Sequence, residues 1–168
     1  TISACRSILG SGHRSLPEDK QDRNEVQQQI LNLNNSDIPI KKQAATLALY
    51  YLASNPANQG TIRETGGIEA LVRQLGDGDT AVKEYTTEAL SELSVNNLAN
   101  QNTIREAGGI TALMGLLEDN DAGVKIASAL ALSGLARDNL ANQDAIREAG
   151  GIALLIALLE DDDAVMKE

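Results

Sequence analysis

The sequence predicts an all-α fold, a solenoid in which each repeat contributes three helices. The first observation is a repeated phrase, because Ala57-Asn58-Gln59 recurs at residues 99–101 and again at 141–143, a period of 42 residues. The second is a Gly-Gly-Ile step that follows each copy, beginning at Gly66, Gly108 and Gly150. The third is the helical spacing of the apolar residues in between. A period of this length with helical patterning is typical of α-solenoids.

The first helix of each repeat is short. In the central copy we expect it over residues 100–107, with Asn100 as its N-cap and Ile104 pointing inward. Gly108 and Gly109 should end it, because glycine tolerates the positive φ at which many helices stop.

The second helix is expected over residues 110–118 of the central copy. Its apolar residues recur at i, i+3, i+4 and i+7, which places them on one face. The stripes of the three copies are Ile68, Leu71, Val72 and Leu75; Ile110, Leu113, Met114 and Leu117; and Ile152, Leu155, Ile156 and Leu159. A short acidic turn follows each stripe, and its Asp side chains can cap the next helix.

The third helix is the longest and is expected over residues 122–137, with Val124, Ala131, Leu132 and Leu135 facing inward. Its counterpart one unit earlier has Val82, Ala89, Leu90 and Leu93 in these places. A further copy is expected over residues 38–53, with Pro39 in the first turn, where proline is tolerated. Two alignments of this helix with the next copy, one residue apart, stay open. Ile40 matches Val82 in one, whereas Leu49 and Leu52 match Leu90 and Leu93 in the other.

This succession closely resembles the armadillo repeat, with a short helix, a Gly-Gly-Ile junction, a Leu-rich helix, an Asp-rich turn and a longer helix. That last helix ends in an Ala-Leu-Ser-x-Leu phrase, here at residues 89–93 and 131–135. The resemblance covers residues 24–168 and implies a right-handed superhelix whose third helices line a concave groove that holds extended peptides. HEAT repeats are the nearest alternative, but they usually have two helices per unit and lack the Gly-Gly-Ile junction.

The predicted organisation has two parts. Residues 1–22 fit no repeat and are expected to form a flexible head or an irregular N-terminal cap. Residues 23–168 form the repeat domain, which divides into a partial unit (23–56), two full units (57–98 and 99–140) and a last unit (141–168) without most of its third helix. The apolar second helix of that last unit would be open, which predicts that the C-terminal end is covered, either by association with another copy or by the N-terminal head folding across a partner.

The composition excludes several classes of function. The net charge is −10, which argues against nucleic acid and against an anionic membrane as direct partners. No apolar run is long enough to span a bilayer. The single cysteine excludes an intrachain disulfide framework and favours a reducing compartment, so we expect a cytoplasmic or nucleocytoplasmic location.

No catalytic, cofactor or metal site is expected. His13 is the only histidine, and Cys5 has no partner that would activate a thiol. The acidic turns lack the alternating ligands and the final Glu of a calcium loop. The Gly-Gly pairs lack the Lys-Ser/Thr of a phosphate loop, so we expect them to be helix stops.

The outward side of the third helices holds the candidate binding residues. With Val82, Leu90 and Leu93 inward, a stripe of glutamates falls on roughly the opposite side of that helix. The same stripe is apolar in the next unit, at Ile126 and Leu130, and its equivalents in the unit before are Leu47 and Tyr51. The predicted peptide-binding residues are Leu47, Tyr51, Glu84, Glu88, Glu92, Ile126, Leu130 and Gly134.

The resemblance also implies what this stripe does not do. Nuclear-import members of the family carry Trp at the positions of Glu88 and Leu130, and Asn at those of Glu92 and Gly134. This sequence has neither, so that ladder is not expected to read nuclear localisation signals here. Catenin-like members use a basic groove for acidic ligands. Because the central stripe here is acidic, that mode of binding also fits this sequence poorly.

The sequence therefore predicts a non-catalytic protein-interaction scaffold. Its partner would be a basic and apolar peptide, or an amphipathic helix with Lys or Arg on its rim. One alternative is an excised or engineered repeat scaffold whose main association is with itself. Two simpler interpretations stay open: the glutamates serve solubility alone, or a neighbouring third helix buries Ile126 and Leu130.

Overall fold

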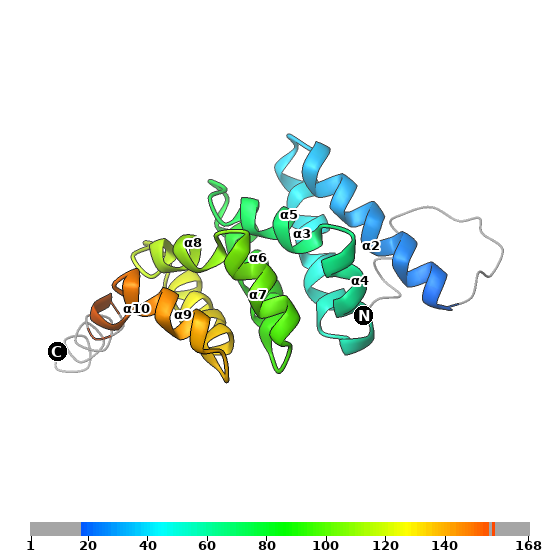
Figure 1. The fold of residues 1–168 in the computed structure, drawn as a ribbon. Coiled ribbons are helices and arrows are strands. Elements are labelled where there is room, and N and C mark those ends of the chain that lie inside the picture. Colours follow the sequence, from blue (N-terminus) through cyan, green and yellow to red (C-terminus); the bar gives the residue numbers. More distant parts are fainter. Residues whose placement is uncertain (1–17, 155, 157–168) are drawn as a thin grey trace.

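The structure, a computed structural model, describes residues 18–154 and 156, with side chains from residue 22 onward. Predictions that concern Cys5, His13, Leu155 and Leu159 lie outside these residues. The part that is described is built from helices, and no strand occurs in it. In chain order they are α2 (Glu18–Asn35), α3 (Pro39–Ala53), α4 (Pro56–Glu64), α5 (Gly67–Gln74), α6 (Thr80–Ser94), α7 (Leu98–Glu106), α8 (Gly109–Leu116), α9 (Ala122–Ala136) and α10 (Leu140–Glu148) (Figure 1).

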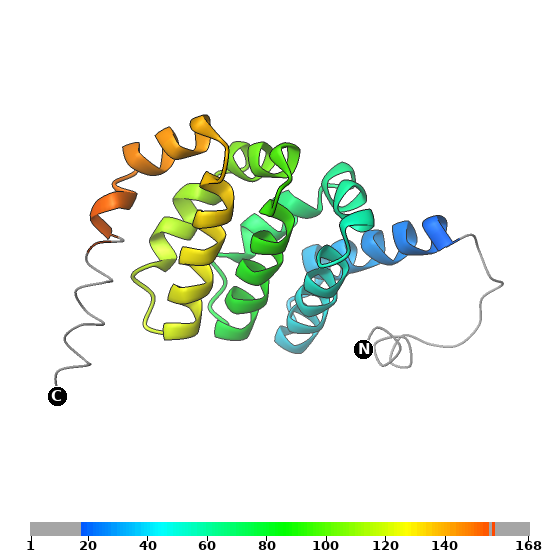
Figure 2. The same cartoon turned by 90° about the horizontal axis from the view of Figure 1, so that it is seen from below.

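These helices form the predicted all-α solenoid. The trios α4, α5, α6 and α7, α8, α9 are the two three-helix units, and each packs on the next. Figure 2 shows the long third helices α3, α6 and α9 side by side on the inner side of an arc, with α4, α7 and α10 along its outer edge. Helix α2 begins at Glu18, five residues before the expected start of the repeat domain.

The predicted inward residues of the two full units form the core. All of them are buried except Val72, which is half-buried and packs against the others. In α3, Leu49 and Leu52 are buried whereas Ile40 is 68% exposed. The match to Leu90 and Leu93 is therefore correct, and α3 precedes α6 by 41 residues.

The last stripe behaves differently. Ile152 and Ile156 belong to the second helix that was expected to be open, and they are 57% and 51% exposed. In the complete units this stripe packs under the third helix that follows it. The residues after 156, where the third helix of this unit would begin, lie outside the described part of the chain.

The first helix of the central unit begins earlier than expected. Asn97, not Asn100, is the N-cap of α7, because its side chain accepts a hydrogen bond from the Asn100 backbone N–H at 3.2 Å. Asn100 lies inside the helix and is fully buried. Its Nδ2 donates to the Leu93 carbonyl at 2.9 Å, and its Oδ1 accepts from Arg63 at 2.9 Å. The prediction was wrong because this side chain joins neighbouring helices instead of capping its own.

The two glycines of each pair have separate functions. Gly66, Gly108 and Gly150 have φ values of 78°, 82° and 81°, the left-handed conformation that glycine adopts most easily. The second glycine packs closely instead. A Cβ on Gly109 would lie 2.5 Å from Ile104 Cγ2 and 2.8 Å from the Ile104 carbonyl oxygen. The predicted helix stop is thus confirmed at the first glycine.

A buried amide ladder ties the third helices together at their C-terminal ends. Gln59 Nε2 donates to the carbonyls of Ala53 and Glu92, and its Oε1 accepts from Asn97. Gln101 repeats these bonds one unit later, to Ser94, Gly134 and Asn139. The repeated Ala-Asn-Gln phrase therefore encodes contacts between units.

Candidate functional site

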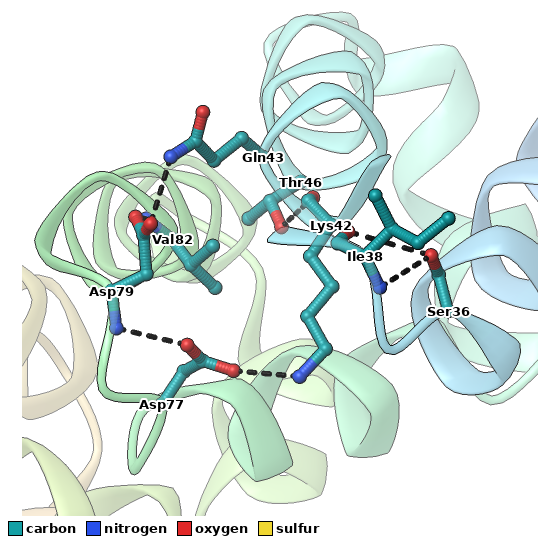
Figure 3. A network of polar contacts seen from close by, with 8 residues as sticks. All are labelled: Ser36, Ile38, Lys42, Gln43, Thr46, Asp77, Asp79 and Val82. Carbon is teal, nitrogen blue, oxygen red and sulfur yellow. Dashed lines mark hydrogen bonds and ion pairs between the residues drawn. The ribbon is translucent and has the colours of Figure 1, made fainter. Parts of the chain in front are cut away.

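The contact between α3 and α6 shows how one unit normally meets the next (Figure 3). Lys42 Nζ donates to Asp77 at 2.8 Å, and Gln43 Nε2 donates to Asp79 at 2.8 Å. Asp79 also caps α6, since its other oxygen accepts from the Val82 N–H at 3.1 Å. The hydrogen bond from Lys42 is the main reason that the pKa of Asp77 lies below its usual value. Each carboxylate at this edge faces a donor.

The contact between α6 and α9 keeps part of this pattern and changes the rest. Lys83 pairs with Asp119, which lowers the pKa of that carboxyl group, and Asp121 caps α9. Glu84 stands where α3 has Gln43, so Asp121 receives no amide donor from α6. A Cβ on Gly123 would lie 3.0 Å from Asp121 Oδ1 and 3.3 Å from Glu84 Oε1. Two carboxylates thus flank the N-terminus of α9, where the helix dipole favours negative charge.

An open groove of about 360 Å³ lies between α6 and α9. It brings together five of the predicted binding residues, three from α6 and two from α9. Tyr50, from α3, also lines the groove, as do Ser91, Gly123 and Ala127. The five predicted residues are Glu84, Glu88, Glu92, Ile126 and Leu130.

The other three predicted residues do not line this groove. Leu47 is half-buried and Tyr51 is 45% exposed. Gly134 faces α6, because a Cβ there would collide with the Ser94 hydroxyl, and its carbonyl accepts from Gln101. Gly134 thus serves packing between the third helices.

Tyr50 is the largest of the lining residues that the sequence analysis missed, the others being Ser91, Gly123 and Ala127. Its ring lies against that of Tyr51, with the centroids 5.3 Å apart. With α3 placed 41 residues before α6, Tyr50 corresponds to Ser91, which also lines the groove. The predicted residues Leu47 and Tyr51 already assumed this register, so Tyr50 fell one position outside the predicted stripe.

The glutamates make the groove negatively charged. None of the ion pairs among the described residues involves Glu84, Glu88 or Glu92. Burial raises the pKa of Glu88, and the neighbouring carboxylates of Glu84 and Glu92 raise it further. Burial and the charges of Glu88 and Glu92 likewise raise the pKa of Tyr50. A positive group placed here would relieve this repulsion.

Two apolar side chains stand beside the carboxylates. Ile126 and Leu130, one turn apart on α9, are 62% and 60% exposed. No described helix covers them. The groove therefore offers an acidic side and an apolar side to one ligand.

Other kinds of site find little support in the same part of the chain. Groups of three or more His, Cys, Asp or Glu placed to hold a metal ion are absent from the described residues. Among the helices described here, none has the length and hydropathy needed to cross a bilayer.

Comparison with known proteins finds a family model that matches one of the repeats. The model of the armadillo/beta-catenin-like repeat matches residues 55–95, which span α4 to α6. No match was found among curated proteins.

Solved structures share the fold. An engineered protein is 28% identical with a TM-score of 0.78, over 84% of this chain and 59% of that one. A designed armadillo repeat protein is 26% identical with a TM-score of 0.77, over 81% and 57%. Another designed armadillo repeat protein, in complex with the peptide (KR)4, is 19% identical with a TM-score of 0.76, over 89% and 68%.

The chain spans less than two thirds of the length of the first two of these proteins. The 42-residue period, the three-helix units and the family match agree with one another. The chain therefore has the armadillo solenoid fold, and its repeat at residues 55–95 matches the armadillo/beta-catenin-like repeat.

Proposed function

We propose that the chain is a non-catalytic scaffold that binds a basic and apolar segment of another protein in the groove between α6 and α9. One observation carries the proposal: three carboxylates on α6 pair with no cation among the described residues and lie beside two exposed apolar side chains of α9. Cationic and apolar groups on one ligand would satisfy both sides.

The partial burial of Glu88 disfavours solubility as the only purpose of the glutamates. A solvated stripe costs little when its carboxylates are exposed, but Glu88 is half-buried and its pKa is raised by burial and by its neighbours. Keeping it charged in the free protein is unfavourable. A bound Lys or Arg would offset that cost, and Tyr50 could pack against the cation or its stem.

The known structures support the proposal at the level of the fold. A designed protein of this fold has been captured with the peptide (KR)4, which shows that an armadillo solenoid can present a site for a basic peptide. At 19% identity the likeness concerns the fold, so the argument for this chain rests on its own residues.

Charge reversal at Glu88 tests the proposal. We expect a Lys- and Leu-containing peptide to bind the wild type, and an acidic twin with Glu in place of Lys to fail. Binding should weaken with added salt, because exposed charges are screened over a Debye length of about 8 Å at physiological ionic strength. Glu88→Lys should reduce the affinity by about tenfold or more, measured by fluorescence titration.

Glu148→Lys is the matched control, because Glu148 is exposed at the end of α10, away from the groove. Equal affinity of Glu88→Lys and Glu148→Lys would contradict the proposal, and so would equal binding of the acidic twin. A lower pH should also weaken binding, because Glu88 becomes neutral as the pH falls through its raised pKa.

Self-association through the last unit and the cytoplasmic or nucleocytoplasmic location stay predictions. Ile152 and Ile156 are exposed, and the residues that follow them lie outside the described part.

A further inference from the structure

We propose that the segment bound in this groove is an amphipathic α-helix that lies along α6 and α9, with a basic stripe on α6 and an apolar stripe on α9. This inference rests on the proposed function and adds the conformation and direction of the ligand. It follows from how the chemistry of the inner face is distributed.

Each third helix presents one kind of side chain along its length. Glu84, Glu88 and Glu92 follow at intervals of four residues on α6, about 6 Å apart along its axis. Ile126 and Leu130 have the same interval on α9. Residues spaced by four form a ridge on a helix surface, so an acidic ridge runs beside an apolar one.

The exposed side chains change from acidic on α6 to apolar on α9. Packed helices have axes about 8–10 Å apart, a distance that roughly three extended residues cover. A peptide extended across the face would therefore contact one apolar and one acidic residue before reaching α3. Only a ligand that runs along α6 and α9 contacts both ridges over their whole length.

The two ridges face the same side, which favours a helix over a strand. An extended chain that runs along α6 points alternate side chains in opposite directions, so half of them leave the groove. An α-helix places residues i, i+4, i+8 and residues i+3, i+7, i+11 in adjacent rows. It can therefore set a row of lysines on α6 and a row of leucines on α9 at once.

The space between the ridges suits such packing. Three of the residues that line the groove are small: Ser91 on α6, and Gly123 and Ala127 on α9. Small side chains there leave a furrow into which the ridge of another helix can fit.

Three synthetic peptides of about 18 residues test the inference. The first carries Lys at i, i+4 and i+8 and Leu at i+3, i+7 and i+11, with Ala and Gln elsewhere. The second has the same composition, with the leucines moved to the far side of the helix. The third is the first with one central Ala replaced by Pro, which breaks the helix. We expect the first to bind and to gain helical circular dichroism, and the others to bind about tenfold more weakly or worse.

Matched variants of the protein locate the apolar row. Leu130→Ser should weaken the first peptide about fivefold or more, since one apolar contact is lost. Leu140→Ser is the control, because Leu140 is 78% exposed on α10, outside the groove, and its loss should leave the affinity unchanged.

The outcomes separate the two proposals. If the proline peptide binds as tightly as the first, and Glu88→Lys weakens both, the groove binds basic segments and the helical ligand is wrong. If none of the three peptides binds, the proposed function fails as well. Binding of the second peptide at full strength would also overturn the side-by-side arrangement.

Discussion

Replacing Gly109 by alanine is expected to lower the free energy of unfolding by about 1–3 kcal/mol, the usual cost of overpacking. The new Cβ would lie 2.5 Å from Ile104 Cγ2 and 2.8 Å from the Ile104 carbonyl oxygen. The side chain could move, but the carbonyl belongs to the last turn of α7 and cannot. The junction between α7 and α8 would have to open, and thermal or denaturant unfolding measures the cost.

Gly115→Ala is the matched control. Gly115 lies in α8 with nothing within 4 Å of its Cβ position, so alanine there should be neutral or stabilise by about 0.5–1 kcal/mol through its higher helix propensity. The two substitutions add the same methyl group and should act in opposite directions. A melting temperature for Gly109→Ala at or above that of the wild type would contradict the packing described for the Gly-Gly junction.

Replacing Gln101 by methionine is expected to cost about 2–4 kcal/mol of stability. The side chain is 2% exposed, donates to the Ser94 and Gly134 carbonyls at 3.0 and 3.1 Å, and accepts from Asn139 at 3.1 Å. Each buried hydrogen bond contributes about 0.5–1.5 kcal/mol net, and methionine of similar size replaces none of them. Because the bonds join α7 to α6 and α9, their loss should loosen the contact between units.

Gln143→Met provides the comparison, since Gln143 occupies the same place one unit later but is exposed and makes one bond, to the Ala136 carbonyl. We expect a cost below about 1 kcal/mol there. Urea unfolding of both variants decides the point: equal losses would mean that the amide ladder contributes no more than an exposed hydrogen bond.

The apolar periodicity was enough to predict the architecture. Stripes such as Ile110, Leu113, Met114 and Leu117 can be buried together only on a helix, and they recur at the period of the repeat. The interpretation of the asparagines was less successful. Asn97 and Asn100 are equally good cap residues by type, and the choice between them depends on the Leu93 carbonyl and Arg63, which the fold brings to Asn100. The repeated Ala-Asn-Gln phrase marks the position of Asn100, but only the packing of the helices shows which groups it bonds.

The candidate groove was predictable in part for the same reason. A rotation of 100° per residue places Glu84, Glu88 and Glu92 in one stripe, and Ile126 and Leu130 in another. Tyr50 was missed because it corresponds to Ser91 in α6, which lies one position outside the predicted stripe. The sequence alone does not show why it matters that Glu84 stands in the place of Gln43. Gln43 donates to Asp79 at the N-terminus of α6, whereas Glu84 lies near the N-terminus of α9, which Asp121 caps.

The most direct test of the account maps where a basic and apolar peptide binds. The amide resonances of isotope-labelled protein would be followed during titration with the peptide that carries adjacent Lys and Leu rows. We expect the largest shifts in α6 and α9, around Glu84, Glu88 and Glu92 and from Gly123 to Leu130, with small shifts in α4, α7 and α10. Shifts confined to those outer helices, or to residues after Gly150, would contradict the claim that the inner face is the binding surface.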